Sequence, residues 1–206
     1  MVVHRRAWQL SRGGWLGRVT LVLASRSPRR QDILRAAGIP VIVRPADIDE
    51  TPLPGEGAED LVRRLAQAKA RAIPVQQGQV VLGADTAVVT QGETLGKPVD
   101  AEDARRMWRL LAGHECSTIT GICLRDAQRE IVDLAASRLT FMSLDEAEIE
   151  SYIASGEWRD KAGAYAIQGL ASKFVERVTQ DYYNVMGLPV ALVYKHLRTW
   201  PAFALP

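Results

Sequence analysis

Short apolar and polar blocks follow one another along this 206-residue chain, and their spacing predicts alternating strands and helices. The apolar run 19–24 is typical of a buried strand. Ser27 followed by Pro28 predicts a helix N-cap with proline in the first helical position. That helix would continue to Ala37 and end at Gly38. The chain therefore opens with a strand, a tight turn and a helix.

The later blocks extend this pattern. Helical spacing predicts helices over 59–73, 100–112, 143–153 and 188–197, and β-branched or apolar runs predict strands over 39–44, 80–82, 87–90, a short stretch ending at Leu95, 116–124, 131–141 and 174–175. Asp100 is the expected N-cap of the second of these helices, and Ser143 with Glu146 forms a possible capping box for the third. Hairpins interrupt the strand and helix alternation, so we expect an α/β fold with a mixed sheet.

Composition fits one globular domain, expected over 19–200, with two lobes. The chain is 47% hydrophobic and 24% charged, and it has no apolar run long enough to cross a bilayer. Cys116 and Cys123 would point to opposite faces of one predicted strand, which argues against a disulfide. These features favour a cytoplasmic protein without a membrane partner.

Charge is distributed unevenly between the N-terminus and the rest of the chain. The first 30 residues contain seven Arg and no Asp, Glu or Lys, whereas the remainder carries 19 basic and 24 acidic residues. We interpret 1–18 as a basic extension, either an arm for nucleic acid or membrane or a loose segment, and 201–206 as a tail. The acidic body disfavours broad binding to nucleic acid.

The turn at residues 25–30 combines two hydroxyls with three guanidiniums. A helix N-terminus presents unpaired N–H groups and a partial positive charge, and Arg29 and Arg30 add donor forks that match phosphate oxygens. The alternative is that both arginines are solvated residues of the first turn. Cations at a helix N-terminus are mildly unfavourable without an anion, so we favour an anion site.

Asp85 is the candidate for catalysis, because it follows the apolar run 80–82 and would lie at the exit of a buried strand. Its alternative role is that of a turn residue in the segment 83–86. Lys97 and Lys161 are each flanked by turn residues, although either could be an ordinary surface lysine. Together with Arg29, Arg30, Lys69, Glu50 and Asp85, they supply cations for a polyphosphate and carboxylates for Mg²⁺ or Mn²⁺. This combination is suited to phosphoanhydride hydrolysis.

Other chemistries find less support in the sequence. The three histidines are far apart, and there is no zinc-binding spacing, no Walker-type loop, no Gly-x-Gly-x-x-Gly and no nucleophile elbow. Trp158, Tyr182 and Tyr183 could stack on a base, although aromatic residues in such positions more often serve packing.

Six segments in this order resemble the signatures of the Maf family of nucleoside triphosphate pyrophosphatases. They are LASRSPRR, GADT, LGKP, Thr120-Gly121, DKAGAYAIQG and YYNVMGLP. The resemblance covers about nine-tenths of the chain. It implies an inosine-triphosphatase-like (Maf/Ham1) α/β fold, with a mixed twisted sheet and two lobes around a central cleft. It also implies a homodimer and metal-dependent cleavage between the α and β phosphates of a nucleotide.

The same resemblance assigns roles to individual residues. Asp85 matches the family's catalytic proton acceptor, and the polar cleft residues match Ser25, Arg29, Arg30, Glu50, Lys69 and Lys97. Arg29, Thr86 and Gln168 match the specificity residues of the dTTP and UTP pyrophosphatase branch. A Gln amide can pair with the O4 and N3–H edge that thymine and uracil share. Arg26 and Gln180 depart from the family pattern, the first by adding a charge to the phosphate turn, the second by replacing a common glycine.

The resulting hypothesis is hydrolysis of dTTP and UTP, and of modified pyrimidine nucleotides, in nucleotide-pool house-cleaning. Asp85 and Glu50 would hold the divalent metal, Asp85 would assist the attacking water, and Arg29, Arg30, Lys69 and Lys97 would absorb the charge on pyrophosphate. The alternative is a nucleotide-sensing or nucleic-acid-binding regulator linked to septum formation, with little turnover.

Overall fold

The structure is a computed structural model that describes residues 19–200. The predicted extension 1–18 and tail 201–206 lie outside the described residues. The strands are β1 (Thr20–Leu23), β2 (Val41–Val43), β3 (Gln79–Thr90), β4 (Glu93–Leu95), β5 (Glu115–Arg125), β6 (Glu130–Phe141) and β7 (Val175–Thr179). The helices are α1 (Pro28–Ala36), α2 (Ala58–Arg71), α3 (Ala101–Leu111), α4 (Glu146–Ser155), α5 (Tyr182–Val185) and α6 (Val190–Leu197), with 3-10 helices η1 (Ala162–Ala164) and η2 (Leu170–Phe174).

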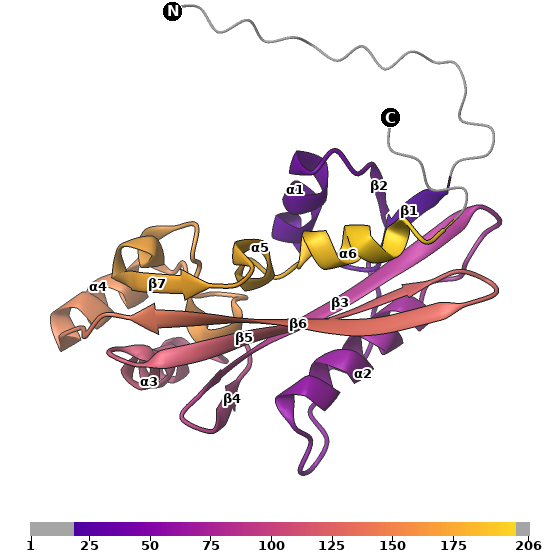
Figure 1. The fold of residues 1–206 in the computed structure, drawn as a ribbon. Coiled ribbons are helices and arrows are strands. Elements are labelled where there is room, and N and C mark those ends of the chain that lie inside the picture. The colour runs from indigo at the N-terminus through magenta and orange to yellow at the C-terminus, as the bar shows by residue number, and fades with distance from the viewer. Residues whose placement is uncertain (1–18, 201–206) are drawn as a thin grey trace, which may run out of the picture.

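The strands form one mixed sheet, as the sequence predicted. Its order is β2-β1-β3-β5-β6-β7, and β4 pairs with β3 outside this path. β1 runs parallel to both β2 and β3, whereas the pairs β3–β5, β5–β6 and β6–β7 are antiparallel. Figure 1 shows α1 and α6 on one face of the long twisted strands and α2 on the other. The prediction of an α/β fold with a mixed sheet is confirmed.

Separate hydrophobic cores at the two ends of the sheet define two lobes. One core packs α1 and α6 against β1, β3 and β5, with Ile33, Val193 and Leu82 among its buried members. The other gathers α3, α4 and the 3-10 helices around Trp108 and Phe141. The long strands β3, β5 and β6 run through both lobes and connect them (Figure 1).

The first turn of α1 has the predicted geometry. Oγ of Ser27 accepts a hydrogen bond from the Arg30 amide, Pro28 occupies the first helical turn, and Gly38 has a positive φ of 69° just after the helix. Cys116 is free and buried in the core around Trp108, and Cys123 is free and buried in a smaller core beneath α2, in agreement with the expected absence of a disulfide between them. Within residues 19–200, no helix has the length and apolar character needed to cross a membrane.

Two local predictions were wrong, and one short helix was missed. The segment 83–86 does not separate two strands, because β3 continues through it and all four of its residues pair with β5. The capping box of α4 uses Asp145 and Glu148 instead of Ser143 and Glu146, since the helix begins at Glu146. The short helix α5 was not predicted, because its four residues contain too little periodicity to reveal it.

Gln180, which the family resemblance marks as a replacement for a common glycine, has the backbone conformation that favours glycine. Its φ is +68°, in the left-handed region. Its side-chain oxygen accepts hydrogen bonds from the Arg138 amide and the Thr179 hydroxyl, at 3.2 and 2.7 Å. These bonds offset part of the conformational strain at a turn next to α5.

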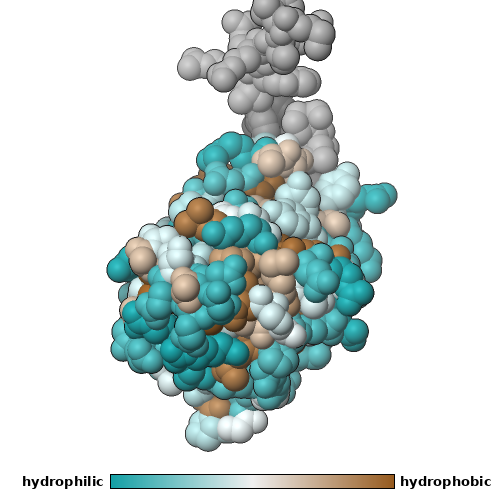
Figure 2. Space-filling model, turned by 90° about the vertical axis from the view of Figure 1, so that its left-hand side faces the viewer, coloured by the Kyte–Doolittle hydropathy of each residue, from teal (hydrophilic) through white to brown (hydrophobic). Residues whose placement is uncertain are grey.

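The surface of the α4 and β7 end is mainly hydrophilic. Figure 2 shows this end with hydrophobic residues restricted to a central strip. Met142, directly after β6, and Leu170 in η2 are exposed large hydrophobic residues, 45% and 52% accessible.

Candidate active site

A cavity of about 640 Å³ lies between the two lobes. The turn after β1, the loop before α2, the middle of β3, and the segments 160–168 and 185–187 all contribute to its wall. The ten site residues predicted from the sequence all line it: Ser25, Arg29, Arg30, Glu50, Lys69, Asp85, Thr86, Lys97, Lys161 and Gln168. Residues that are up to 143 positions apart in the chain (Ser25 and Gln168) thus share one cavity.

The charge of the cavity wall is suited to an anionic ligand that carries several negative charges. Six basic side chains line it: Arg26, Arg29, Arg30, Lys69, Lys97 and Lys161. Four carboxylates oppose them: Asp47, Glu50, Asp85 and Asp160. The excess of cations favours a polyphosphate, and the carboxylates offer acceptors for a proton or a metal ion.

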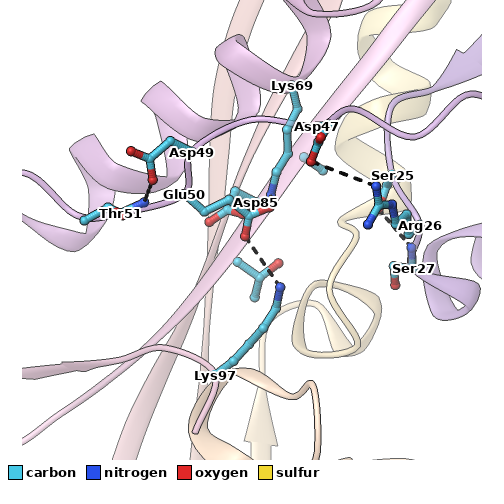
Figure 3. Close-up of polar contacts among 12 residues, drawn as sticks. Ser25, Arg26, Ser27, Asp47, Asp49, Glu50, Thr51, Lys69, Asp85 and Lys97 are labelled. Carbon is cyan, nitrogen blue, oxygen red and sulfur yellow. Dashed lines mark hydrogen bonds and ion pairs between the residues drawn. The ribbon is translucent and has the colours of Figure 1, made fainter. Parts of the chain in front are cut away.

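Lys69 bridges the two carboxylates that are central to the site. Its Nζ donates to Oδ1 of Asp85 at 2.5 Å and lies 2.9 Å from Oε1 of Glu50. Lys97 Nζ contacts the other oxygen of Glu50 at 3.5 Å, so the charges alternate along this row (Figure 3). Burial disfavours ionisation of Glu50, but Lys69, and then Lys97, outweigh this effect and lower its pKa.

Two glycines allow α2 to lie close enough for this bridge. A Cβ on Gly83 of β3 would be 2.1 Å from the carbonyl oxygen of Ala66, and one on Gly121 of β5 would be 2.4 Å from that of Val62. Gly121 pairs directly with Asp85 across the two strands. The absence of side chains there permits the close approach of helix and sheet that buries Lys69 beside Asp85.

Asp85 lies in the interior of β3, although the sequence suggested a strand exit. The parallel neighbour β1 ends at Leu23, which pairs with Leu82, so β3 extends beyond the end of β1 before it reaches Asp85. The cavity therefore opens at the carboxyl end of β1, the usual place for ligands in open α/β sheets. Asp85 remains 9% exposed there.

The loop that carries Glu50 is fastened to α2 by an ion pair. Arg64 donates from Nε and Nη2 to the two carboxylate oxygens of Glu56, at 2.5 and 2.7 Å, and Nη2 also contacts the carbonyl of Thr51. The Arg64 hydrogen bond, supported by the Leu53 amide, lowers the pKa of Glu56 from 4.5 to about 2. This bidentate pair fixes the loop on the same helix that presents Lys69.

The two arginines of the phosphate turn differ in their surroundings. The Arg29 side chain makes no hydrogen bond or ion pair within residues 19–200. Burial lowers the pKa of its guanidinium, and the negative charge of Asp160 counteracts only part of this shift. Arg30 is 9% exposed and donates four of its five side-chain N–H bonds to protein acceptors. One N–H of Arg30 thus remains for a phosphate oxygen.

The remaining predicted residues occupy different depths of the cavity. Thr86 is half-buried, with its hydroxyl 3.0 Å from that of Thr120, whereas Gln168 is exposed. Lys161 Nζ donates to the carbonyl of Arg159, and burial, followed by the charge of Arg29, lowers the pKa of its ammonium. Placement in one cavity agrees with the predicted roles of these residues, which stay predictions.

Sequence reasoning missed several lining residues. Tyr165 is 5% exposed and its hydroxyl is 3.0 Å from that of Thr118; burial raises its pKa well above the usual value. Tyr165 lies in the segment 160–169, which is one of the motifs that carry the family resemblance, so this motif could have identified it as a site residue.

Trp158 has a packing role, because it is 6% exposed and its indole N–H donates to the Ile153 carbonyl.

The donor set fits a divalent metal that is shared with a ligand. Within residues 19–200, no three His, Cys, Asp or Glu side chains come together as a metal cage. Asp85 and Glu50 share the ammonium of Lys69, so they form a pair of hard oxygen donors on the cavity wall. Mg²⁺ commonly binds one or two carboxylates together with substrate phosphates, and this pair provides that kind of site.

The fold and this cavity define an α/β protein with a cationic site for a phosphorylated ligand. The family model of the Maf-like protein matches residues 20–200, and the chain belongs to this family.

Relatives named dTTP/UTP pyrophosphatase are similar over most of the chain. The relative from Anaeromyxobacter dehalogenans (strain 2CP-C) is 50% identical over 190 residues, which cover 90% of this chain and 96% of that protein. The relative from Geobacter sp. (strain M21) is 47% identical, with 87% and 94% covered. The relative from Hahella chejuensis is 49% identical, with 84% and 89% covered.

Solved structures match a smaller part of this chain than these relatives do. A dITP/XTP pyrophosphatase from Mycobacterium abscessus has a TM-score of 0.38 and 13% identity, and covers 61% of this chain and 76% of its own. A HAM1 protein from Coxiella burnetii has a TM-score of 0.39 and 14% identity, with 60% and 73% covered.

Proposed function

We propose that this protein hydrolyses dTTP and UTP to the nucleoside monophosphate and pyrophosphate. The observation that carries this proposal is the position of Asp85 beside the buried ammonium of Lys69, in a cavity of about 640 Å³ that five further cations line. Relatives with close to half of their residues identical are named dTTP/UTP pyrophosphatase, which supports the same substrates here.

The reaction requires a proton acceptor, and Asp85 is placed to serve as one. A water molecule attacks the α-phosphorus and transfers a proton to a carboxylate oxygen of Asp85, while the bond from that phosphorus to the bridging oxygen breaks. The ammonium of Lys69, 2.5 Å from Oδ1, holds the carboxylate in one orientation. The Asp85 carboxylate thus meets the attacking water in a fixed position.

Negative charge builds up on the leaving pyrophosphate, and cations of the cavity wall stabilise it. Arg29 offers its full donor fork, and Lys97 and Lys161 can shift toward the phosphates from flexible stems. Burial disfavours the charged forms of Arg29 and Lys161 in the free protein, and pairing with phosphate offsets this cost.

We also propose a bound divalent metal. Asp85 and Glu50 would hold Mg²⁺ or Mn²⁺ together with oxygens of the triphosphate. When bound, the ion would neutralise phosphate charge and polarise the reacting phosphoryl group. Lys69 already balances the two carboxylates, so we expect metal to enter with the nucleotide instead of binding the free protein tightly.

Base selection is assigned to Arg29, Thr86 and Gln168. The amide of Gln168 is exposed on the cavity wall, where it can donate to O4 and accept from N3–H of thymine or uracil. Cytosine presents a donor at position 4 and an acceptor at N3, so its rejection requires that the bound nucleotide's surroundings hold the amide in the orientation that pairs with uracil. The homodimer that the family resemblance implies remains a prediction.

The experiment is a nucleotide panel with Mg²⁺ or Mn²⁺, resolved by chromatography. dTTP, UTP and 5-methyluridine triphosphate should yield monophosphate and pyrophosphate, with CTP and purine nucleotides slower by at least about tenfold. Asp85→Asn should abolish nearly all turnover while the protein stays folded by circular dichroism. Absence of monophosphate from every nucleotide, or near-normal turnover in Asp85→Asn, would refute this assignment.

A further inference from the structure

Arg30 is a buried residue of the cavity wall and connects three segments that are distant in the sequence. Its Nε donates to the carbonyl of Gly187 at 2.8 Å, Nη1 donates to the carbonyl of Ala84 at 2.9 Å and to Oγ of Ser25 at 3.3 Å, and Nη2 donates to Oγ1 of Thr86 at 3.1 Å. The guanidinium therefore joins the turn after β1, the middle of β3 and the turn that follows α5.

The two contacts on β3 lie on either side of Asp85. Ala84 and Thr86 precede and follow it, and the planar fork of Arg30 bonds to both at once. The planar guanidinium presents its donors in fixed directions, so it can hold two such acceptors at once. The guanidinium thus braces β3 on both sides of Asp85, in addition to the pairing of this segment with β5.

Thr86 illustrates the effect on a neighbouring group. Its hydroxyl oxygen accepts from Arg30, lies 3.0 Å from the hydroxyl of Thr120 and lies 3.4 Å from the carbonyl of Gly187. With the Arg30 donor in place, the Thr86 proton is directed toward Thr120 or Gly187. The Arg30 donor thus restricts the hydroxyl proton to these two directions.

Arg29 offers a natural contrast one residue earlier. It lines the same cavity but has no hydrogen bond within the described part of the chain, whereas Arg30 uses four of its five donors on protein acceptors. A group whose donors are already paired gains little by turning to a phosphate, because it must leave buried carbonyls unsatisfied. The neighbouring arginines are thus built for different tasks.

We propose that Arg30 is a positioning residue, which fixes Asp85 and the Thr86 hydroxyl through its guanidinium fork, and that Arg29 of this pair is the phosphate ligand. The kinetic part of this inference rests on the proposed pyrophosphatase activity. The architectural part concerns the substrate-free protein and is tested without nucleotide.

The test compares Arg30→Lys with Arg29→Lys. Both keep the positive charge and remove the fork. Arg30→Lys should lower the melting temperature of the nucleotide-free protein by several degrees and reduce kcat for dTTP at least tenfold, with KM changed less than about threefold. Arg29→Lys should keep the melting temperature within about one degree and act mainly by raising KM. Assays are made well below both melting temperatures.

A double-mutant cycle with Thr86→Val provides the second measurement. Because Arg30 and Thr86 share one hydrogen bond, Thr86→Val should lower the melting temperature less in the Arg30→Lys background than in the natural protein. If Arg30→Lys cannot be purified, Thr86→Val alone decides: a fall in kcat at constant KM supports the proposal, and unchanged kcat overturns it.

The proposal is overturned if Arg30→Lys melts like the natural protein and loses activity through KM alone, or if the two substitutions lower the melting temperature additively. Failure of the natural protein to hydrolyse any nucleotide would refute the pyrophosphatase activity, whereas the melting data would still decide whether Arg30 holds the three segments together.

Discussion

The ammonium nitrogen of Lys69 lies 2.5 Å from Oδ1 of Asp85, and both side chains are largely buried. This contact joins α2 to β3 and, through Glu50, reaches the loop that precedes α2. The position of the carboxylate thus depends on a helix, a strand and a loop that are separate in the sequence.

Lys69→Met should reduce kcat for dTTP by about 100-fold or more, because Asp85 loses the group that orients it. It should also lower the free energy of unfolding by about 1–3 kcal/mol, since a largely buried carboxylate loses its charged partner. Steady-state kinetics and urea unfolding measure both effects. The exposed Lys195→Met on α6 is the control and should change neither quantity. Near-normal kcat in Lys69→Met would contradict the orienting role.

Glu56→Gln should make stability less dependent on pH in the acid range. The pKa of Glu56 is lowered from 4.5 to about 2, so its ionised form contributes stability that is present above pH 4.5 and is lost as pH falls toward 2. The melting temperature of Glu56→Gln should lie below that of the natural protein at pH 6, and the gap should close between pH 4.5 and pH 2. A gap that stays constant over this range would exclude the Glu56–Arg64 pair as its cause.

Gly121→Ala should destabilise the protein by about 3 kcal/mol or more, because the new Cβ would meet the α2 backbone, which cannot move as a flexible side chain can. Since Asp85 is its cross-strand partner, activity should fall as well. Gly96→Ala is the matched control: its Cβ meets nothing within 4 Å and its effect on unfolding should stay below about 1 kcal/mol. Equal unfolding curves for the two variants would contradict the close approach of α2.

Arg26→Ala should raise KM for dTTP a few-fold and leave kcat and stability nearly unchanged. The Arg26 side chain is 75% exposed and lies 3.9 Å from Asp47, so this pair contributes little to folding. Its charge attracts the triphosphate toward the cavity, and the effect on KM should therefore shrink at high salt. Arg35→Ala, on the outer part of α1, serves as the control. An effect on KM that is independent of salt would indicate a direct contact instead.

The sequence predicted those parts of the fold that depend on local signals. Ser27, Pro28 and Gly38 mark the ends of α1 through residue types with specific backbone preferences, and all three occupy the expected positions. The segment 83–86 was expected to separate two strands because glycine, here Gly83, is typical of turns. Its actual role is to make room for the α2 backbone, and this depends on packing between distant segments.

The members of the candidate site were predictable from motifs, and their connections were not. All ten predicted residues line the cavity, but nothing local reveals that Lys69 bridges Asp85 and Glu50. The pairing of Arg30 with Gly187 spans 157 positions and depends on the turn after α5, a helix too short to be predicted. Such contacts arise only when the two lobes pack together.

The most direct test of the central claim is hydrolysis of dTTP in water enriched in ¹⁸O, with mass spectrometry of both products. Attack on the α-phosphorus beside Asp85 predicts one ¹⁸O atom in the monophosphate and none in the pyrophosphate. Label in the pyrophosphate, or release of inorganic phosphate as the primary product, would contradict it.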